Sequence, residues 1–485
     1  MQCKNAKWIL PLAFSVFSTP IQTQEADKIK LPDMGDSAGA LISPFEEKKL
    51  GDAFFRMLHS EININNDPEI QQYIQDIGQR LVTNSDAPGS PFHFFVVIDK
   101  SINAFAGPGG YIGINSGLII TTESESEMAS VMAHEVAHVT QRHLYRAFEA
   151  ASQLSIPTAA AMLAAILLGT QNAELGMAAL TAIQAGSIQF QIDFTRSNEQ
   201  EADRIGMQTL VQSNLDPRSM PIFFERLQQS SRYYGKGIPE FLRTHPVTAS
   251  RISDTRSRAE NYSYRQYPDS LNYLLTKAKL RINTLENHGD IIRYFSIRKN
   301  QGTKEQRAVA RYGLGLFALK KQQFKKAENI FQQLVTEFPN QPQYTTALAR
   351  TALDQRKYNI ALARYRQAQK NFPRNSAIKF EYITTLLKSG YAKQAYQALN
   401  VLDLKEKQQP NYYHLLAETH GALNQKAKSH RYMAEYYYTT GQTHQAITQI
   451  KLAQKSKQLN FYLAAILDER LKYFTEEEKQ RKQDQ

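Results

Sequence analysis

Cysteine is almost missing from this chain of 485 residues, because Cys3 is the only one. It precedes a short apolar run at the N-terminus, which is the wrong side of such a run for a lipid-anchored cysteine. If the segment that contains the run is removed, the mature chain has neither a disulfide nor a thiol nucleophile. Such a composition is compatible with an oxidising compartment.

Long apolar runs are missing as well. The N-terminal run from Trp8 to Phe17 is about ten residues long, whereas a helix that spans a membrane needs roughly 20. Because basic residues precede the run, residues 1–24 are typical of a secretory signal peptide. The alternative is the frayed N-terminus of a cytosolic protein.

A second apolar run covers residues 156–169, and an Ala-rich stretch follows Glu174. Neither reaches the length of a membrane-spanning helix. We expect residues 156–190 to form a helical hairpin that packs over the domain or covers its site. The alternative is shallow, peripheral contact with a membrane surface.

Acidic residues are scarce in the second half of the chain. The formal net charge is +12, and residues 301–485 alone carry about +15, which leaves about −3 for residues 1–300. A basic surface confined to one half favours an acidic protein partner or an anionic membrane surface. No nucleic-acid-binding motif accompanies this charge, so we expect no nucleic-acid partner.

Helical and strand-like patterns are mixed in the first half of the chain. Apolar residues recur at helical spacing over residues 44–84, which predicts two helices. Aromatic and β-branched residues dominate 92–99, and a second strand-like region with many glycines covers 102–120, so we expect a hairpin in a small sheet. Residues 122–148 predict a long helix whose acidic first turns suit the helix dipole.

That long helix carries the chemistry, since His134, Glu135 and His138 form the pattern H-E-x-x-H. Residues four apart share a helical face, so both imidazoles can bind one metal ion. Glu135 lies about 100° round the helix and can hold a metal-bound water. Chance alone gives this pattern in roughly one such sequence in seventy, so the pattern does not by itself establish a metal site. The alternative is a helix with two surface histidines whose hydrogen bonds are satisfied without a metal.

A catalytic zinc needs three protein ligands and one open position. His143 follows His138 by five residues, on a different face and too near in sequence to fold back. A later helix begins near Asn198, a candidate N-cap, and carries Glu199 and Asp203 four residues apart. One carboxylate can bind the metal while the other accepts the distal N–H of a ligand histidine. An acidic first turn that merely suits the helix dipole explains this pair equally well.

These motifs resemble those of the zinc metallopeptidases related to CAAX prenyl proteases and HtpX. The resemblance rests on His-Glu-Val-Ala-His at 134–138, Asn-Glu-Gln-Glu-Ala-Asp at 198–203 and Thr-His-Pro at 244–246. The relatives most often studied are integral membrane proteins. The lack of a spanning helix departs from them and agrees with a periplasmic, repeat-bearing branch of the family.

The resemblance implies one Zn²⁺ per chain, with Glu199 as the third protein ligand and Asp203 behind the ligands. Glu201 then has no role. The implied reaction is hydrolysis of a peptide bond, in which Glu135 takes a proton from the zinc-bound water and later delivers it to the leaving amine.

His245 precedes Pro246, so its backbone is expected to be extended and to lie in a loop. The resemblance implies that this histidine acts as a regulatory latch at the open position of the zinc, whereas the sequence alone equally allows a loop histidine without that duty. Arg251 and Asn103 are candidate substrate-binding residues. The segment 103–117 is a candidate edge strand for aligning an extended substrate, and an ordinary structural hairpin explains it as well.

From about residue 305 the chain repeats itself with the 34-residue period of tetratricopeptide repeats. Small, aromatic and proline positions recur at that offset: Ala327, Phe331 and Pro339 as Ala361, Tyr365 and Pro373, with Ala395 continuing the small position. Small residues let two antiparallel helices approach, and the proline ends the second helix. We expect about four repeats with an irregular cap; an unrelated helical bundle is the alternative.

The sequence therefore predicts an α+β, zincin-like metalloprotease domain, mostly helical with a small sheet, followed by an all-α tetratricopeptide solenoid. The predicted boundaries are 1–24 for the signal peptide, 25–265 for the protease domain, 266–304 for a helical linker, 305–475 for the repeats and 476–485 for a polar tail.

The expected function is that of a periplasmic zinc metalloendopeptidase. The resemblance of the whole chain to the repeat-bearing branch implies misfolded or stalled outer-membrane β-barrel proteins as substrates, and assistance to their assembly. It also implies that the repeats dock on the outer-membrane β-barrel assembly machinery. The alternatives are a chaperone-like repeat scaffold whose protease is normally latched by His245, and a cytosolic peptidase.

Overall fold

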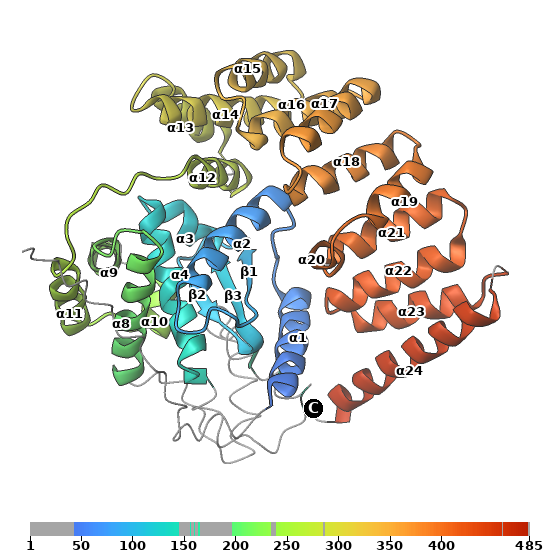
Figure 1. Cartoon of the computed structure of the whole chain (residues 1–485), viewed down its shortest axis with the longest axis horizontal. Coiled ribbons are helices and arrows are strands. Elements are labelled where there is room, and N and C mark those ends of the chain that lie inside the picture. Colours follow the sequence, from blue (N-terminus) through green and yellow to red (C-terminus); the bar gives the residue numbers. More distant parts are fainter. Residues whose placement is uncertain are drawn as a thin grey trace, which may run out of the picture.

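The computed structural model describes most of the chain from residue 43 onward: residues 43–144, 196–233, 239–284, 287–457 and 459–483, with 156, 160, 163 and 164. The predicted signal peptide and nearly all of the predicted hairpin at 156–190 lie outside the described residues. Figure 1 shows an N-terminal unit around a small sheet, with a chain of helix pairs passing over and beside it. Among the described helices, none is both long enough and apolar enough to cross a membrane.

The N-terminal unit surrounds its sheet with helices. Its elements are α1 (Pro44–Glu61), α2 (Pro68–Thr83), β1 (His93–Val97), β2 (Ala104–Ala106), η2 (Pro108–Gly110), β3 (Tyr111–Asn115), α3 (Ser116–Thr121), α4 (Glu125–Thr140), α8 (Arg196–Gln212), α9 (Ser219–Tyr233), α10 (Glu240–Thr244) and α11 (Ala249–Glu260). The two helices predicted over residues 44–84 are confirmed as α1 and α2. Each begins with a proline behind an N-cap side chain, Ser43 or Asp67.

The small sheet is present, but the predicted pairing of its strands was wrong. The strand order is β1-β3-β2, with β1 parallel to β3 and β2 antiparallel to β3. The hairpin therefore lies inside the region 102–120, whose last residues form α3. Its tight turn uses Gly109 and Gly110 at φ 69° and 76°, a conformation that glycine adopts without steric cost.

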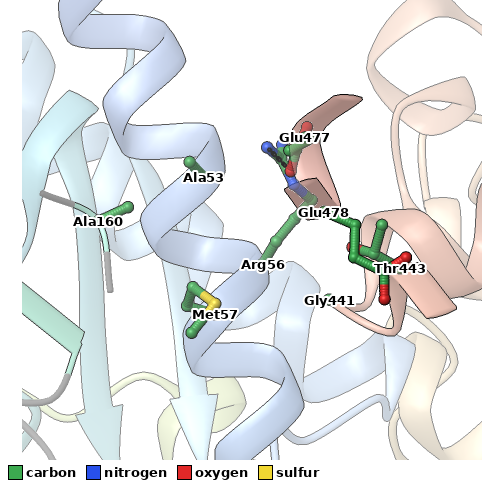
Figure 2. A pocket seen from close by; sticks show the side chains of 8 residues that line it. All are labelled: Ala53, Arg56, Met57, Ala160, Gly441, Thr443, Glu477 and Glu478. Atoms are coloured by element: carbon green, nitrogen blue, oxygen red, sulfur yellow. Dashed lines mark hydrogen bonds and ion pairs between the residues drawn. The ribbon is translucent and has the colours of Figure 1, made fainter. Parts of the chain in front are cut away.

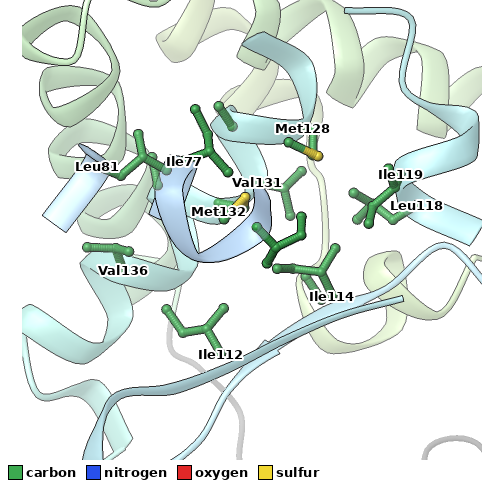
Figure 3. Close-up of a cluster of buried hydrophobic side chains, with 14 of the residues drawn as sticks. Ile77, Leu81, Ile112, Ile114, Leu118, Ile119, Met128, Val131, Met132 and Val136 are labelled. Atoms are coloured by element: carbon green, nitrogen blue, oxygen red, sulfur yellow. The ribbon is translucent and has the colours of Figure 1, made fainter. Parts of the chain in front are cut away.

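Helix α4 lies at the centre of the N-terminal unit. Every residue from Glu125 to His138 is buried, because α2, α8, α9 and the sheet all pack against this helix. Its apolar side chains form one cluster with Ile77 and Leu81 of α2 and Ile112 and Ile114 of β3 (Figure 3). In a helix enclosed on all sides, polar side chains need partners or a bound ion.

The ends of the site helices differ from the predictions. Helix α4 begins at Glu125 behind the N-cap Ser124 and ends at Thr140, inside the predicted range 122–148; residues 145–148 lie outside the described part. Arg196 already belongs to α8, so Asn198 lies within the helix and the predicted N-cap there was wrong.

The second part of the chain is a stack of helix pairs. Its helices are α12 (Leu271–Thr284), α13 (His288–Arg298), α14 (Lys304–Lys320), α15 (Phe324–Glu337), α16 (Pro342–Asp354), α17 (Tyr358–Asn371), α18 (Ser376–Lys388), α19 (Ala392–Asn400), α20 (Leu404–Lys407), α21 (Pro410–Ala422), α22 (Lys426–Thr439), α23 (Thr443–Gln454) and α24 (Phe461–Gln483). The predicted repeat solenoid is confirmed. Its recurring positions Ala327, Phe331, Ala361 and Tyr365 are fully buried, as close packing of helix pairs requires.

The solenoid extends beyond the predicted repeat range at both ends. Helices α12 and α13, from the predicted linker, share a hydrophobic cluster with α14 and α15. At the other end, α24 continues as a helix through the predicted polar tail to Gln483.

The solenoid contacts the N-terminal unit at the start of α2. Lys279 of α12 lies 2.6 Å from Asp67 and 2.7 Å from Glu69. Thr346 of α16 also donates a hydrogen bond to Glu69. This partly buried ion cluster fixes the position of α12 and α16 against α2.

The end of the solenoid returns to α1 (Figures 1 and 2). Arg56 of α1 pairs with Glu477 of α24 at 3.1 Å, and its guanidinium lies 4.6 Å from the centre of the Tyr438 ring. Gly441 packs so closely on α1 that a Cβ there would overlap the carbonyl oxygen of Arg56. Arg56, Gly441 and Glu477 line a small cavity between the two parts, together with Met57.

Candidate metal centre

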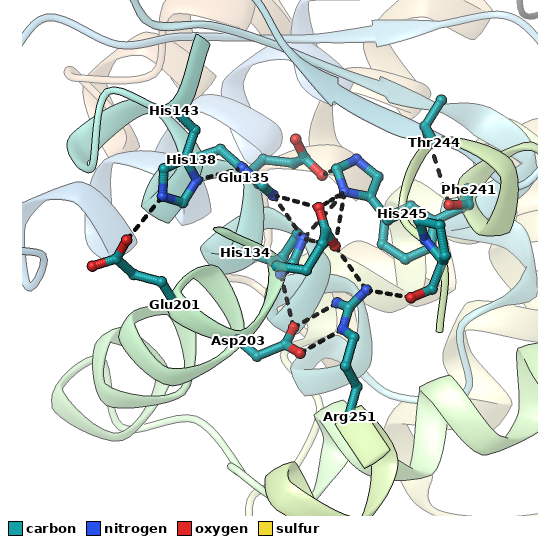
Figure 4. A network of polar contacts seen from close by, with 12 residues as sticks. His134, Glu135, His138, His143, Glu201, Asp203, Phe241, Thr244, His245 and Arg251 are labelled. Carbon is teal, nitrogen blue, oxygen red and sulfur yellow. Dashed lines mark hydrogen bonds and ion pairs between the residues drawn. The ribbon is translucent and has the colours of Figure 1, made fainter. Parts of the chain in front are cut away.

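The centre is built first on α4, which presents two histidines from one face (Figure 4). Nε2 of His138 lies 3.0 Å from Nε2 of His134, as the four-residue spacing predicts. Glu135 is buried beside them, and its Oε1 has no hydrogen-bond partner among the described residues. The helix therefore brings two nitrogen donors and one unsatisfied carboxylate oxygen together.

Helix α8 supplies the carboxylates. Gly206 lets α8 approach α4 closely, since a Cβ there would lie 3.1 Å from the backbone of Ala133 and His134. Glu199 then places Oε2 3.5 Å from Nε2 of His134 and Oε1 3.4 Å from Nε2 of His138. The structure thus brings Glu199 onto the two histidines, although it lies far from them in the sequence.

Asp203 lies behind this group, one helical turn after Glu199. Its Oδ1 is 3.0 Å from Nδ1 of His134. Arg251 of α11 donates to both oxygens of Asp203 at 2.7 and 2.8 Å, and its Nη1 is 2.7 Å from Glu199. The guanidinium is buried and also donates to the carbonyl of Pro246. Arg251 therefore holds the two carboxylates in place here, and its substrate-binding role stays a prediction.

His245 enters the cluster from the loop after α10, and the predicted loop position is confirmed. Its ring stacks on Phe241 with 4.9 Å between the ring centres. Nδ1 lies 3.1 Å from Glu199 and 3.3 Å from Nε2 of His134, and Nε2 lies 3.5 Å from Glu135. The ring thus fills the side of the cluster between Glu135 and Glu199.

The side chains present fit a metal ion. His134, His138, Glu199 and His245 each offer one donor atom, and these four atoms lie within 4.8 Å of one another. Imidazole nitrogens with a carboxylate oxygen are donors that zinc and related divalent metals prefer. All four residues are buried, and the Glu135 oxygen that has no hydrogen-bond partner among the described residues lies 3.5 Å from Nε2 of His245. A bound cation would accept the lone pairs of these buried donor atoms, which have little access to water.

The charges of the metal-free cluster follow from burial and from its hydrogen bonds. Burial opposes protonation of His134, but hydrogen bonds with Asp203 and Glu199 outweigh burial and raise its pKa to about 9. Burial lowers the pKa of His138 well below its usual range. For Glu199, burial is outweighed by the charge of His245 and by the histidine hydrogen bonds, which lower its pKa well below normal. The metal-free site therefore favours an ionised Glu199 and a cationic His134 ring that carries a proton on each nitrogen.

Asn103 lies at the start of β2, an edge strand of the sheet. It is buried, and its carbonyl accepts a hydrogen bond from Asn115 at 3.0 Å. Its side-chain oxygen has no partner among the described residues. Its substrate-binding role stays a prediction.

Two polar residues were missed by the sequence reasoning. His143 was predicted to be unable to fold back, yet its Nδ1 lies 2.8 Å from Nδ1 of His138. Glu201, which was given no role, lies 3.2 Å from the other ring nitrogen of His143. In the sequence, Glu201 lies two positions from both Glu199 and Asp203. That spacing alone does not indicate a contact with His143.

Comparisons with known proteins agree with both parts of the chain. The family described as Peptidase family M48 matches residues 68–259, and the Tetratricopeptide repeat family matches residues 352–419. The β-barrel assembly-enhancing protease of Escherichia coli (strain K12) is 37% identical over 400 residues, which cover 82% of this chain and 81% of that protein. The Yersinia pestis protein of the same name is 35% identical over 388 residues, or 80% of each chain.

A more distant relative is a mitochondrial metalloendopeptidase of Schizosaccharomyces pombe (strain 972). It is 27% identical over 181 residues, which cover 37% of this chain and 50% of that protein.

A buried H-E-x-x-H helix that meets a glutamate from a second helix, followed by a tetratricopeptide solenoid, defines the class: the protein is a repeat-bearing metallopeptidase. The predicted enzyme class is thereby confirmed. The chain belongs to the family of the β-barrel assembly-enhancing proteases, and its residues 68–259 match peptidase family M48.

Proposed function

We propose that this metallopeptidase is a periplasmic zinc endopeptidase that degrades misfolded or stalled outer-membrane β-barrel proteins and assists the assembly of productive ones. The observation that carries the proposal is the meeting of His134, His138 and Glu199 in one buried cluster, with Glu135 beside them. The names of the bacterial relatives support the substrate class and the compartment.

In the proposed reaction, His134, His138 and Glu199 hold the zinc. When bound, zinc polarises the scissile carbonyl and lowers the pKa of a water molecule to about 7. Glu135 accepts the proton of the attacking water and delivers it to the leaving amine. Burial raises the pKa of the Glu135 carboxyl, which makes it a stronger base for the first of these steps. Asp203 holds the ring of His134 in the orientation that the ligand needs.

His245 is the regulatory latch in this proposal. A hydrolytic zinc site keeps one position open, whereas here a fourth donor completes the set. The His245 ring is only 3% exposed and lies between Glu135 and Glu199. Withdrawal of this ring would free a position for substrate and bring Glu135 into contact with water.

The repeats are the proposed docking part of the molecule. Residues 301–485 carry about +15 of the net charge, which suits an acidic protein surface. We propose the outer-membrane β-barrel assembly machinery as their partner, in keeping with the names of the relatives. Cross-linking of the purified chain to that machinery, with and without charge reversal on the solenoid, tests this part separately.

Cleavage of an unfolded protein such as casein tests the enzyme. The parent chain should cleave slowly, His245→Ala should cleave faster, and Glu135→Gln should be inactive in either background. His420→Ala, a buried histidine of the solenoid, is the matched control and should behave as the parent. If Glu135→Gln retains the parent's activity, the proposed chemistry is wrong.

A second candidate function is a chaperone-like repeat scaffold whose protease site is normally closed. The buried position of His245 in the cluster favours it. The two functions separate in the same assay: a His245→Ala chain that gains no activity supports the scaffold and contradicts the latched endopeptidase.

A further inference from the structure

The turn after α4 brings a further histidine back onto the metal centre. Helix α4 ends at Thr140, and Arg142 adopts a left-handed conformation with φ 55°. This conformation, which residues other than glycine seldom adopt, reverses the direction of the chain as in common helix C-caps. As a result His143 folds back against His138, and its ring is 1% exposed.

The contacts of the His143 ring define a chain of hydrogen bonds (Figure 4). Its Nδ1 lies 2.8 Å from Nδ1 of His138, and its Nε2 lies 3.2 Å from Oε2 of Glu201. Because Nε2 of His138 faces His134 and Glu199, that nitrogen is the one available to a metal. The proton of a neutral His138 ring then belongs on Nδ1.

This assignment determines the remaining protons. If Nδ1–H of His138 donates, Nδ1 of His143 must accept, so the proton of the neutral His143 ring lies on Nε2 and points to Glu201. Ionised Glu201 can only accept. One arrangement of protons therefore satisfies all three groups when Nε2 of His138 binds a metal.

Each of the two proposed ligand histidines is then linked by hydrogen bonds to a carboxylate of α8. His134 meets Asp203 directly at 3.0 Å, whereas His138 reaches Glu201 through His143. We propose that His143 and Glu201 are positioning residues, which hold His138 in the ring orientation and tautomer that metal binding requires. This inference rests on the proposed function, because it takes His138 to be a ligand.

Zinc affinity of the full chain, measured by competition with a chromogenic chelator, tests the proposal. We expect His143→Leu to lower affinity about 10–100-fold, as loss of such supporting contacts typically does. His143→Asn keeps an acceptor near Nδ1 of His138 but cannot reach Glu201, so it should lose less. Glu201→Gln should lose about as much as His143→Asn.

The double variant His143→Asn with Glu201→Gln makes the test sharper. If His143 and Glu201 act through the same series of hydrogen bonds, either substitution already interrupts that series. The double variant should then bind zinc as tightly as either single variant. His420→Leu, which removes another buried histidine, should bind zinc like the parent. Parent-like affinity in His143→Leu, or additive losses in the double variant, would overturn the proposal.

A purely structural role is separated by two further measurements. The metal-free variants should unfold thermally near the parent's temperature, and a loss of metal-free stability without a loss of zinc affinity would contradict a positioning role. The visible spectrum of the cobalt-substituted protein should change in His143→Leu, because the ligand field of His138 is altered. If the parent chain itself binds no zinc, the proposed function fails instead.

Discussion

Asp203 places Oδ1 3.0 Å from Nδ1 of His134, whereas Nε2 of the same ring faces His138. The carboxylate therefore determines which nitrogen of His134 is free to bind a metal. Asp203→Asn should lower zinc affinity about 10–100-fold, measured by chelator competition. Asp254→Asn on α11, which removes a half-exposed carboxylate paired with Arg258, is the control. Equal affinity of Asp203→Asn and parent would show that this contact does not support the ligand.

Metal binding should depend on pH through His134. In the metal-free protein the pKa of His134 is raised from 6.5 to about 9, because hydrogen bonds with Asp203 and Glu199 outweigh burial. Its proton stabilises the metal-free fold fully below about pH 6.5, and this contribution is lost as the pH rises through about 9. Zinc must displace that proton.

The increase in Tm on addition of one equivalent of zinc should therefore be larger at pH 9 than at pH 6.5. Thermal unfolding with and without zinc at the two pH values measures it. A gain that is constant, or larger at pH 6.5, contradicts the assignment of the proton to His134.

The ion cluster at the start of α2 should be important for stability. Lys279 is largely buried between Asp67 and Glu69. Lys279→Met leaves two partly buried carboxylates without their cation and should cost about 1–3 kcal/mol of unfolding free energy. Lys472→Met, which removes an exposed lysine, should cost less than about 0.5 kcal/mol. Urea unfolding gives both values, and similar losses in the two variants would show that the cluster is not stabilising.

The contact between the solenoid and α1 depends on Gly441. This residue has φ 75°, and a Cβ would overlap the Arg56 carbonyl. Gly390 has the same kind of conformation, φ 81°, with open space around it. Gly390→Ala should therefore cost only about 1 kcal/mol of backbone strain.

Gly441→Ala should cost about 1–3 kcal/mol more than Gly390→Ala, because α1 must move away. It should also increase the distance between labels on α1 and α24 in solution. Equal stability of the two variants would mean that the contact with α1 contributes little.

The parts of the fold that repeat or lie within one helix could be predicted from the sequence. The spacing of His134 and His138 places both rings on one helical face, and the recurrence of Ala327 as Ala361 marks the repeat. Both depend on local periodicity. The pairing of Glu199 with these histidines came from resemblance, because nothing in the spacing determines how α8 crosses α4.

The parts that were missed depend on backbone turns. The β2–β3 hairpin is set by Gly109 and Gly110 within one apparent strand region. The return of His143 onto His138 depends on the left-handed conformation of Arg142. Arginine seldom adopts this conformation, so the sequence does not predict it. The role of Arg251 as a holder of Glu199 and Asp203 likewise depends on how α11 packs on α8.

In the proposed site Glu199 joins His134 and His138 in binding one metal ion, so the zinc content of the purified protein should depend on Glu199. Glu199→Ala is compared with its parent in the His245→Ala background, where His245 cannot replace the lost ligand. After dialysis against a zinc chelator, the parent should retain one zinc per chain, and Glu199→Ala should retain almost none while staying folded. Equal zinc content in the two folded proteins would show that Glu199 is not a ligand.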